Sequence, residues 1–168
     1  KSLGYSINSL DPEQLRAAEE RLRALKPSVS FVEVEADKAT AKLVSGEAVM
    51  MIGWTGDAVY ASGKNPAIHY ILPEEGAILW GDSLVISAAS PNQYTAEVFL
   101  NFLLRPEISA QIVNEYYYAT ANEAALAFVL PEIRDNPVVF PAKGDFDKGE
   151  WYAPVTDEAL KRHGEIWG

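Results

Sequence analysis

The segment GAILWGDS, residues 76–83, carries the side chains of this chain that are best suited to binding chemistry. Trp80 and Asp82 stand two positions apart in it, between two apolar runs. In a β-strand, residues two apart share a face, so a strand here would point both side chains the same way. An indole face attracts a cation, and a carboxylate adds a full opposite charge. The pair predicts a binding site for an amine. The alternative is that Trp80 is a half-buried core residue and that Asp82 begins a turn.

Trp54 is a second aromatic candidate, at the end of the apolar run AVMMIGW over residues 48–54. The length of the run predicts a buried strand, and a short helix over residues 58–62 is predicted after it. Open α/β sheets place their ligands at the carboxyl ends of such strands. Trp54 is therefore interpreted as a ligand contact, or else as a core residue that closes the strand.

The sequence predicts an alternation of strands and helices, and these elements would position the candidate residues. Asp11 and Pro12 form a helix-start signal before residues 12–25, and Lys26-Pro27 stops that helix. Strands are predicted over residues 28–34, 48–54, 68–72 and 80–86. Further helices are predicted over residues 37–43, 91–104, 107–116, 123–128 and 157–167. Thr120 and Asn122 suggest a cap for the helix over residues 123–128. The pattern indicates an α/β fold, with a mixed sheet flanked by helices.

The composition narrows the class of ligand. The 168 residues include 14 Lys and Arg against 24 Asp and Glu, which gives a formal net charge of −10. Nucleic-acid binding requires a basic surface and is therefore not expected. The acidic balance favours a cationic ligand, or serves solubility alone. The absence of Cys excludes disulfides and thiolate chemistry.

Motifs for catalysis, cofactors and metals are missing. The sequence has no G-x-G-x-x-G, no phosphate-binding loop and no nucleophile elbow. His69 and His163 stand far apart, and neither has a second His at metal-ligand spacing. Glu74 and Glu75 are adjacent in a Pro/Gly turn, where both carboxylates are expected in solvent. We therefore predict no cofactor, no metal and no enzyme activity. The disfavoured alternatives are a hydrolase that uses these glutamates or Asp57 with a His, and an interaction domain without a small ligand.

Five segments in this order resemble the polyamine-binding (spermidine/putrescine-binding) periplasmic proteins of ABC importers. They are MMIGWTGDA, PEEGAILWGDSLVI, AEVFLNFLLRPEISAQI, YYYATAN and KGEWY, and the resemblance runs from about Gly4 to the C-terminus. These proteins are extracellular solute-binding proteins with a two-lobed, type II periplasmic-binding fold. The resemblance implies a partial fold of that type, a fragment of a two-lobed protein.

The resemblance also implies a set of ligand contacts. Trp54 corresponds to a Trp that lines the family's cleft, and Trp80 with Asp82 corresponds to the pair that holds an amine. Tyr118 corresponds to the ligand-facing Tyr of the Y-x-T-x-N segment. Tyr152 stands where many members carry Gln after the Trp of a G-E-W segment. This departure leaves the cargo open between polyamines and other cationic solutes.

The function implied is that of the solute-binding component of an ABC importer, with permease subunits as partners and a periplasmic or extracytoplasmic location. A full-length precursor could also carry a lipid anchor. The alternative keeps the fold and changes the cargo to a sugar, an amino-acid-like compound or a metal chelate.

The chain resembles only the C-terminal half of such a protein. Residues 1–81 would belong mainly to the second lobe, residues 82–126 to the first lobe, and residues 127–168 to the second lobe again. An isolated half would leave apolar edges open, which predicts a dimer.

Overall fold

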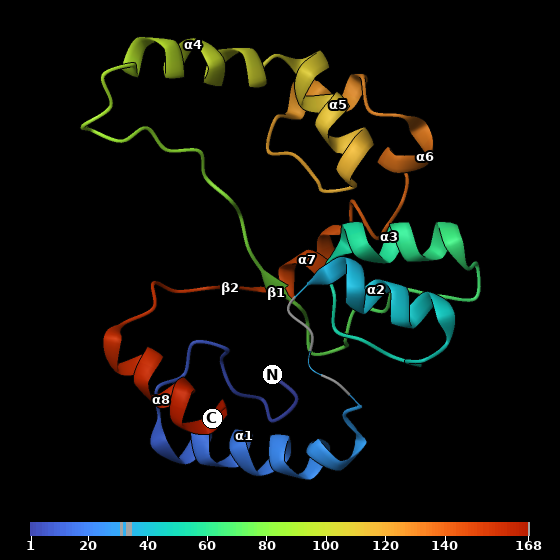
Figure 1. The fold of residues 1–168 in the computed structure, drawn as a ribbon, viewed down its shortest axis with the longest axis vertical. Coiled ribbons are helices and arrows are strands. Elements are labelled where there is room, and N and C mark those ends of the chain that lie inside the picture. Colours follow the sequence, from blue (N-terminus) through green and yellow to red (C-terminus); the bar gives the residue numbers. More distant parts are fainter. Residues whose placement is uncertain (31, 33–34, 168) are drawn as a thin grey trace. The chain divides into compact units, whose positions relative to one another are not determined.

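The computed structural model describes all residues except 31, 33, 34 and 168 (Figure 1). The chain divides into two compact units, and each is described by itself. Unit 1 comprises Lys1–Val34, Ile71–Trp80 and Lys143–Gly168. Unit 2 comprises Glu35–Tyr70 and Gly81–Ala142. These units are compact parts of this chain, so the assignment of residues 1–81, 82–126 and 127–168 to lobes of a longer protein stays a prediction.

Unit 1 contains four helical elements and two short strands among its described residues. They are α1 (Pro12–Leu25), η1 (Lys26–Ser28), β1 (Ile78–Leu79), α7 (Lys143–Asp147), β2 (Glu150–Trp151) and α8 (Asp157–Trp167). The carboxylate of Asp11 accepts the backbone N–H of Glu13 at 2.8 Å and of Gln14 at 3.1 Å, which confirms the predicted start of α1. In Figure 1, α8 lies beside α1.

Parallel pairing of β1 with β2 organises unit 1. Ile78 is in register with Glu150, and Leu79 is in register with Trp151. The turn before β1 requires glycine, because Gly76 has a φ of +89° and a Cβ there would lie 2.1 Å from the carbonyl oxygen of Lys148. The absence of a side chain at Gly76 therefore lets the two strands converge.

The carboxylate of Glu150 ties the N-terminal segment to β2. It accepts hydrogen bonds from Lys1 Nζ at 3.3 Å, from the backbone N–H of Ile7 at 3.2 Å and from the hydroxyl of Ser6. Asn8 Nδ2 donates to the same carboxylate at 3.2 Å. The hydrogen bond from Ser6, followed by those from Ile7 and Lys1, lowers the pKa of Glu150 below its ordinary value.

Unit 2 is helical in its described part. Its elements are α2 (Ala36–Ser45), α3 (Thr55–Lys64), α4 (Gln93–Leu103), α5 (Pro106–Tyr116), η2 (Glu123–Ala127) and α6 (Pro131–Arg134). The core gathers around α5 and consists mostly of small residues: Ala110, Val113, Ala125, Val129, Ile133 and Val139. Val113 is the largest fully buried side chain among the described residues.

The predicted strands over residues 48–54, 68–72 and 80–86 are wrong, since β1 and β2 are the strands of the described residues. A strand forms only where a neighbour supplies hydrogen bonds, and an apolar pattern alone cannot supply one. The predicted strand over residues 28–34 lies partly outside the described residues, and Ser28 belongs to η1.

Replacing Glu150 with Gln should lower the free energy of unfolding near neutral pH. The folded-state pKa of Glu150 lies below its ordinary value of 4.5, so the stabilisation is present above that value and is lost as pH falls through the folded-state pKa. The variant should therefore lose less stability than the wild type over this acid range. Urea unfolding followed by circular dichroism at a series of pH values measures both effects. Glu74→Gln, in the exposed turn of the same unit, is the control; a Glu150→Gln curve parallel to the wild type contradicts the prediction.

Candidate functional site

Trp54 directly precedes α3 in unit 2, and a helix after the apolar run agrees with the sequence prediction. Trp54 occupies the N-cap position with extended backbone angles. An indole has no acceptor with which to cap the helix. The reverse capping bond is present, since the carboxylate of Asp57 accepts the backbone N–H of Trp54 at 3.3 Å. A carboxylate in the first turn also interacts favourably with the helix dipole. The local sequence therefore places Asp57 and Trp54 in the same turn.

Tyr118, which follows α5, packs against this turn of unit 2. The helix α5 ends at Tyr116, and its C-cap residue, Tyr117, adopts the left-handed conformation with a φ of 59° and donates its N–H to the carbonyl of Val113 at 2.9 Å. A Cβ at Gly56 would lie 2.7 Å from the carbonyl oxygen of Tyr116 and 3.0 Å from Cζ of Tyr118. The hydroxyl end of the Tyr118 ring thus lies directly over Gly56.

The residues that follow Tyr118 hold it in place. The hydroxyls of Thr120 and Ser109 lie 2.9 Å apart in a hydrogen bond, and Ser109 is buried on α5. Asn122 donates from its side chain to the carbonyl of Leu104, at the end of α4, at 2.8 Å. Asn122 occupies the predicted N-cap position of η2, but its side chain makes no capping hydrogen bond there because it bonds the end of α4. In the Y-x-T-x-N segment, Thr120 and Asn122 are anchors for the loop.

Two carboxylates act on the phenol of Tyr118. Burial raises the pKa of Tyr118 above its ordinary value, and the negative charges of Asp57 and Asp82 raise it further. Within the described part of the chain, neither Asp57 nor Asp82 forms an ion pair with a lysine or arginine. Unit 2 therefore combines an aromatic pair with two carboxylates that no described basic residue neutralises.

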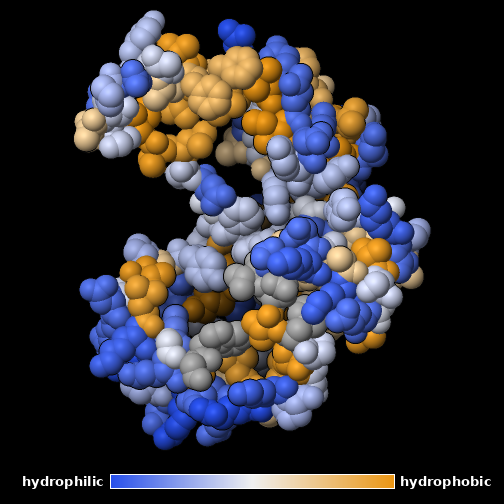
Figure 2. Space-filling model, in the orientation of Figure 1, coloured by the Kyte–Doolittle hydropathy of each residue, from blue (hydrophilic) through white to orange (hydrophobic). Residues whose placement is uncertain are grey.

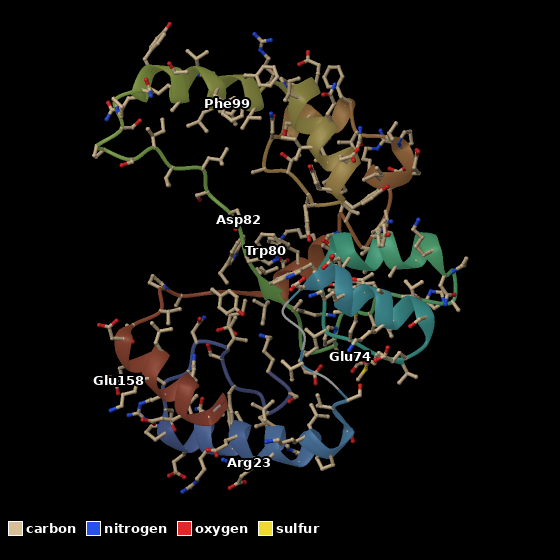
Figure 3. All side chains as sticks on the ribbon, in the orientation of Figure 1. Arg23, Glu74, Trp80, Asp82, Phe99 and Glu158 are labelled. Atoms are coloured by element: carbon tan, nitrogen blue, oxygen red, sulfur yellow. The ribbon has the colours of Figure 1, made fainter. Side chains whose placement is uncertain are left out.

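Trp80 and Tyr152 belong to unit 1. Each follows the last residue of its strand, Trp80 after β1 and Tyr152 after β2, so both stand at the carboxyl edge of the parallel pair. Both side chains are partly exposed, 38% for Trp80 and 55% for Tyr152. Figure 3 labels Trp80 and Asp82, and the boundary between the units falls between them, after Trp80. Their shared face was inferred from a strand over residues 80–86, and because that strand does not form, the reason for expecting a shared face no longer holds.

Asp57 is the residue that the sequence analysis did not include among the ligand contacts. It appeared there only as an acid of the disfavoured hydrolase. A signal was present, because an acid three residues after the residue that precedes a helix lies in the first turn of that helix. Glu74 and Glu75 lie in an exposed turn, where Figure 3 labels Glu74. The N–H of Gly76 closes this turn by donating a hydrogen bond to the carbonyl of Pro73 at 2.9 Å.

A groove between α2 and α3 includes Asp57 in its lining. It has a volume of about 630 Å³, and Asp37, Thr40, Tyr60 and Lys64 are among its lining residues. The ammonium of Lys64 lies 5.3 Å from the centre of the Tyr60 ring. A cation already stacked on this aromatic ring makes the groove less suited to an amine than the surroundings of Tyr118.

Metal binding finds no support in the part of the chain that the structure describes, where no group of three or more His, Cys, Asp or Glu residues could hold an ion. Within the same described residues, no helix combines the length and the apolar character that crossing a membrane requires.

Comparison with known proteins identifies similar chains. A family model described as bacterial extracellular solute-binding protein matches residues 1–141. The spermidine/putrescine-binding periplasmic protein of Salmonella typhimurium is 34% identical over 157 residues, which cover 94% of this chain and 44% of that protein. A putrescine/agmatine-binding protein of Pseudomonas aeruginosa is 30% identical over 84% of this chain and 40% of its own length. The chain therefore spans less than half the length of these curated relatives.

A solved structure has the same fold. The putative spermidine/putrescine ABC transporter protein from Listeria monocytogenes is 27% identical, with a TM-score of 0.88 over 99% of this chain and 51% of that chain. This similarity confirms the predicted fold class, a partial fold of the periplasmic-binding type.

Replacing Gly56 with Ala should destabilise the chain by about 1–3 kcal/mol, because the new methyl group overlaps the Tyr116 carbonyl and the Tyr118 ring. Gly63 is the matched control: it lies in the same helix with no atom within 4 Å of an added Cβ. Gly63→Ala should stabilise the chain by up to about 1 kcal/mol, since alanine has the higher helix propensity. Chemical denaturation measures both, and equal effects of the two substitutions would show that Gly56 is not under steric constraint.

Replacing Asp57 or Asp82 with Asn should lower the pKa of Tyr118, because each substitution removes a negative charge that opposes ionisation of the phenol. Ultraviolet absorbance titration follows the phenolate, and subtraction of the Tyr118→Phe titration isolates this residue from the other tyrosines. Asp145→Asn, on α7 of unit 1, is the control and should leave the titration unchanged. An unchanged Tyr118 titration in both site variants would mean that the carboxylates do not act on the phenol.

Proposed function

The chain belongs to the family of bacterial extracellular solute-binding proteins, and from that premise we propose that it is the polyamine-binding part of an ABC importer's solute-binding component. The observation that carries the proposal is the group of Trp54, Asp57, Asp82 and Tyr118 in unit 2, with two carboxylates around a half-buried phenol. Membership of this family confirms the prediction of a binding protein in place of an enzyme.

The chemistry of this group suits an ammonium ligand. A desolvated ammonium needs a carboxylate partner, because the cost of leaving an isolated charge out of water is large. Aromatic faces add about 0.5–2 kcal/mol per cation contact. In this proposal Asp82 pairs with an ammonium, Trp54 and Tyr118 flank the amine, and Asp57 both holds the Trp54 turn and adds negative charge. Trp80 and Tyr152 remain proposed ligand contacts from unit 1.

Spermidine or putrescine is the proposed cargo. The relative from Salmonella typhimurium is named for these two amines, and the formal net charge of −10 favours a cation. A neutral sugar is less favoured, because two carboxylates without a basic partner would be desolvated with no charge to compensate them.

The proposed partners are the permease subunits of an ABC importer, and the proposed location is periplasmic or extracytoplasmic. The relative from Salmonella typhimurium is named as periplasmic, and the solved structure from Listeria monocytogenes is named as part of an ABC transporter. The assignment of residues 1–81, 82–126 and 127–168 to two lobes, and a dimer of the isolated chain, remain part of the proposal.

Asp82→Asn should weaken spermidine and putrescine binding by about 2–5 kcal/mol, the cost of removing one partner of a desolvated ion pair. Isothermal titration calorimetry measures this in the chain. The same calorimetry measures amine binding by a chimera in which this chain replaces the matched 157 residues of the Salmonella typhimurium relative. Asp145→Asn is the control, since it changes the same side chain on the exposed helix α7 and should bind as the wild type does. A chimera that binds a neutral sugar and neither amine overturns the proposal.

A further inference from the structure

The side chain of Asn8 holds the backbone on both sides of Tyr152. Asn8 Nδ2 donates a hydrogen bond to the carbonyl of Trp151 at 2.9 Å, and the N–H of Ala153 donates to Asn8 Oδ1 at 2.8 Å. The two bonds join residues that are 143 and 145 positions apart in the sequence. One amide group therefore brackets a residue that the sequence analysis includes among the ligand contacts.

The amide of Asn8 takes the place of a neighbouring strand. In a parallel sheet, a residue of the next strand donates its N–H to the carbonyl before the facing residue and accepts the N–H after it. Asn8 makes this pair of bonds with Trp151 and Ala153, on one edge of Tyr152. On the other edge, the N–H of Tyr152 donates to the carbonyl of Leu79 in β1 at 3.4 Å. Tyr152 is thus held from two sides, although β2 itself ends at Trp151.

A second set of hydrogen bonds fixes Asn8 itself. The hydroxyl of Ser6 accepts the backbone N–H of Asn8 at 3.0 Å and donates to the carboxylate of Glu150. Asn8 Nδ2 also donates to that carboxylate at 3.2 Å, and the residue is half-buried. The amide is therefore pre-organised to face Trp151 and Ala153.

The chain beyond β2 has little other support. Residues 152–156 are exposed and adopt no regular secondary structure. Pro154 has no N–H to donate, and it restricts Ala153 to extended conformations. An exposed segment with few hydrogen bonds opens easily. The two bonds of Asn8 are therefore well placed to decide whether Tyr152 keeps one orientation.

We propose that Asn8 is a positioning residue, which holds the ring of Tyr152 for contact with an ammonium ligand. The proposal rests on the proposed function, in which Tyr152 is a ligand contact from unit 1. An aromatic ring attracts a cation only when its face is presented to the charge. Asn8 itself needs no contact with the ligand, because it acts through the backbone at Trp151 and Ala153.

A fluorine label on Tyr152 tests the positioning without any ligand. 3-Fluorotyrosine is incorporated at position 152 of the full chain, and its fluorine NMR resonance is compared with that of the urea-unfolded chain. Asn8→Ala should move the folded resonance toward the unfolded position. Asn8→Asp keeps the size of the side chain and the acceptor for Ala153 but loses the donor to Trp151, so it should shift the resonance in the same direction. Water can replace these exposed bonds, and circular dichroism of both variants should match the wild type.

Asp11→Ala is the matched control. The carboxylate of Asp11 also makes two hydrogen bonds to backbone N–H groups of unit 1, but at the start of α1. Figure 2 shows hydrophilic side chains over α1, so this change too lies at the solvent-exposed surface. It should lower the free energy of unfolding without moving the label resonance, which separates positioning of Tyr152 from a general loss of stability.

Calorimetry with spermidine tests whether the positioning serves the ligand, in the full chain and in the chimera with the Salmonella typhimurium relative. Tyr152→Ala and Asn8→Ala should each weaken binding by about two- to fivefold, the range for one cation contact at an exposed aromatic ring. The double variant should bind no more weakly than Tyr152→Ala alone, because Asn8 acts only through Tyr152.

Three results overturn the proposal: a label resonance that neither Asn8 variant moves, additive losses from Asn8→Ala and Tyr152→Ala, or unchanged spermidine binding by Tyr152→Ala. The last result leaves the proposed function intact, since the amine then binds without Tyr152. If neither the wild-type chain nor the chimera binds an amine, the proposed function is overturned, and the label alone decides whether Asn8 positions Tyr152.

Discussion

The close approach of Tyr118 to Gly56 is the contact on which the arrangement of the candidate site depends. Because Gly56 has no side chain, the carbonyl of Tyr116 and the ring of Tyr118 pack directly on the first turn of α3. The same turn carries Trp54 and Asp57, so one steric requirement brings two aromatic residues and a carboxylate together. The left-handed Tyr117 makes this possible, since it ends α5 and directs the chain toward α3.

The electrostatics of this group favour a cationic ligand. Asp57 and Asp82 both place negative charge near a phenol that is already partly desolvated, and no described basic residue neutralises either carboxylate. Of these groups Tyr118 has the shifted pKa, and a titratable side chain shifted by burial and by specific charged neighbours marks a candidate functional site. Structural ion pairs in this chain look different: Glu150, for example, is surrounded by donors from Lys1, Ser6 and Ile7.

The core of unit 2 shows how little apolar surface this chain buries by itself. Its buried members are mostly alanine and valine, whereas Ile52, Val85 and Phe99 remain exposed. A chain of ordinary composition normally places its large apolar residues inside. The imbalance agrees with the length comparison, in which the matched structure carries about as much chain again.

Local signals in the sequence determined the helices, their ends and the identity of the aromatic candidates. Asp11 caps α1, Pro106 begins α5 and a helix follows Trp54, since capping and proline geometry act within a single turn. The strands predicted over residues 48–54 and 80–86 did not form, because strand formation depends on neighbours from elsewhere in the polypeptide that a local apolar pattern does not reveal. Only the tertiary structure brought Asp57 and Asp82 to Tyr118 and assigned Thr120 and Asn122 to anchoring. Such contacts join residues distant in sequence, and a single sequence does not record distances between them.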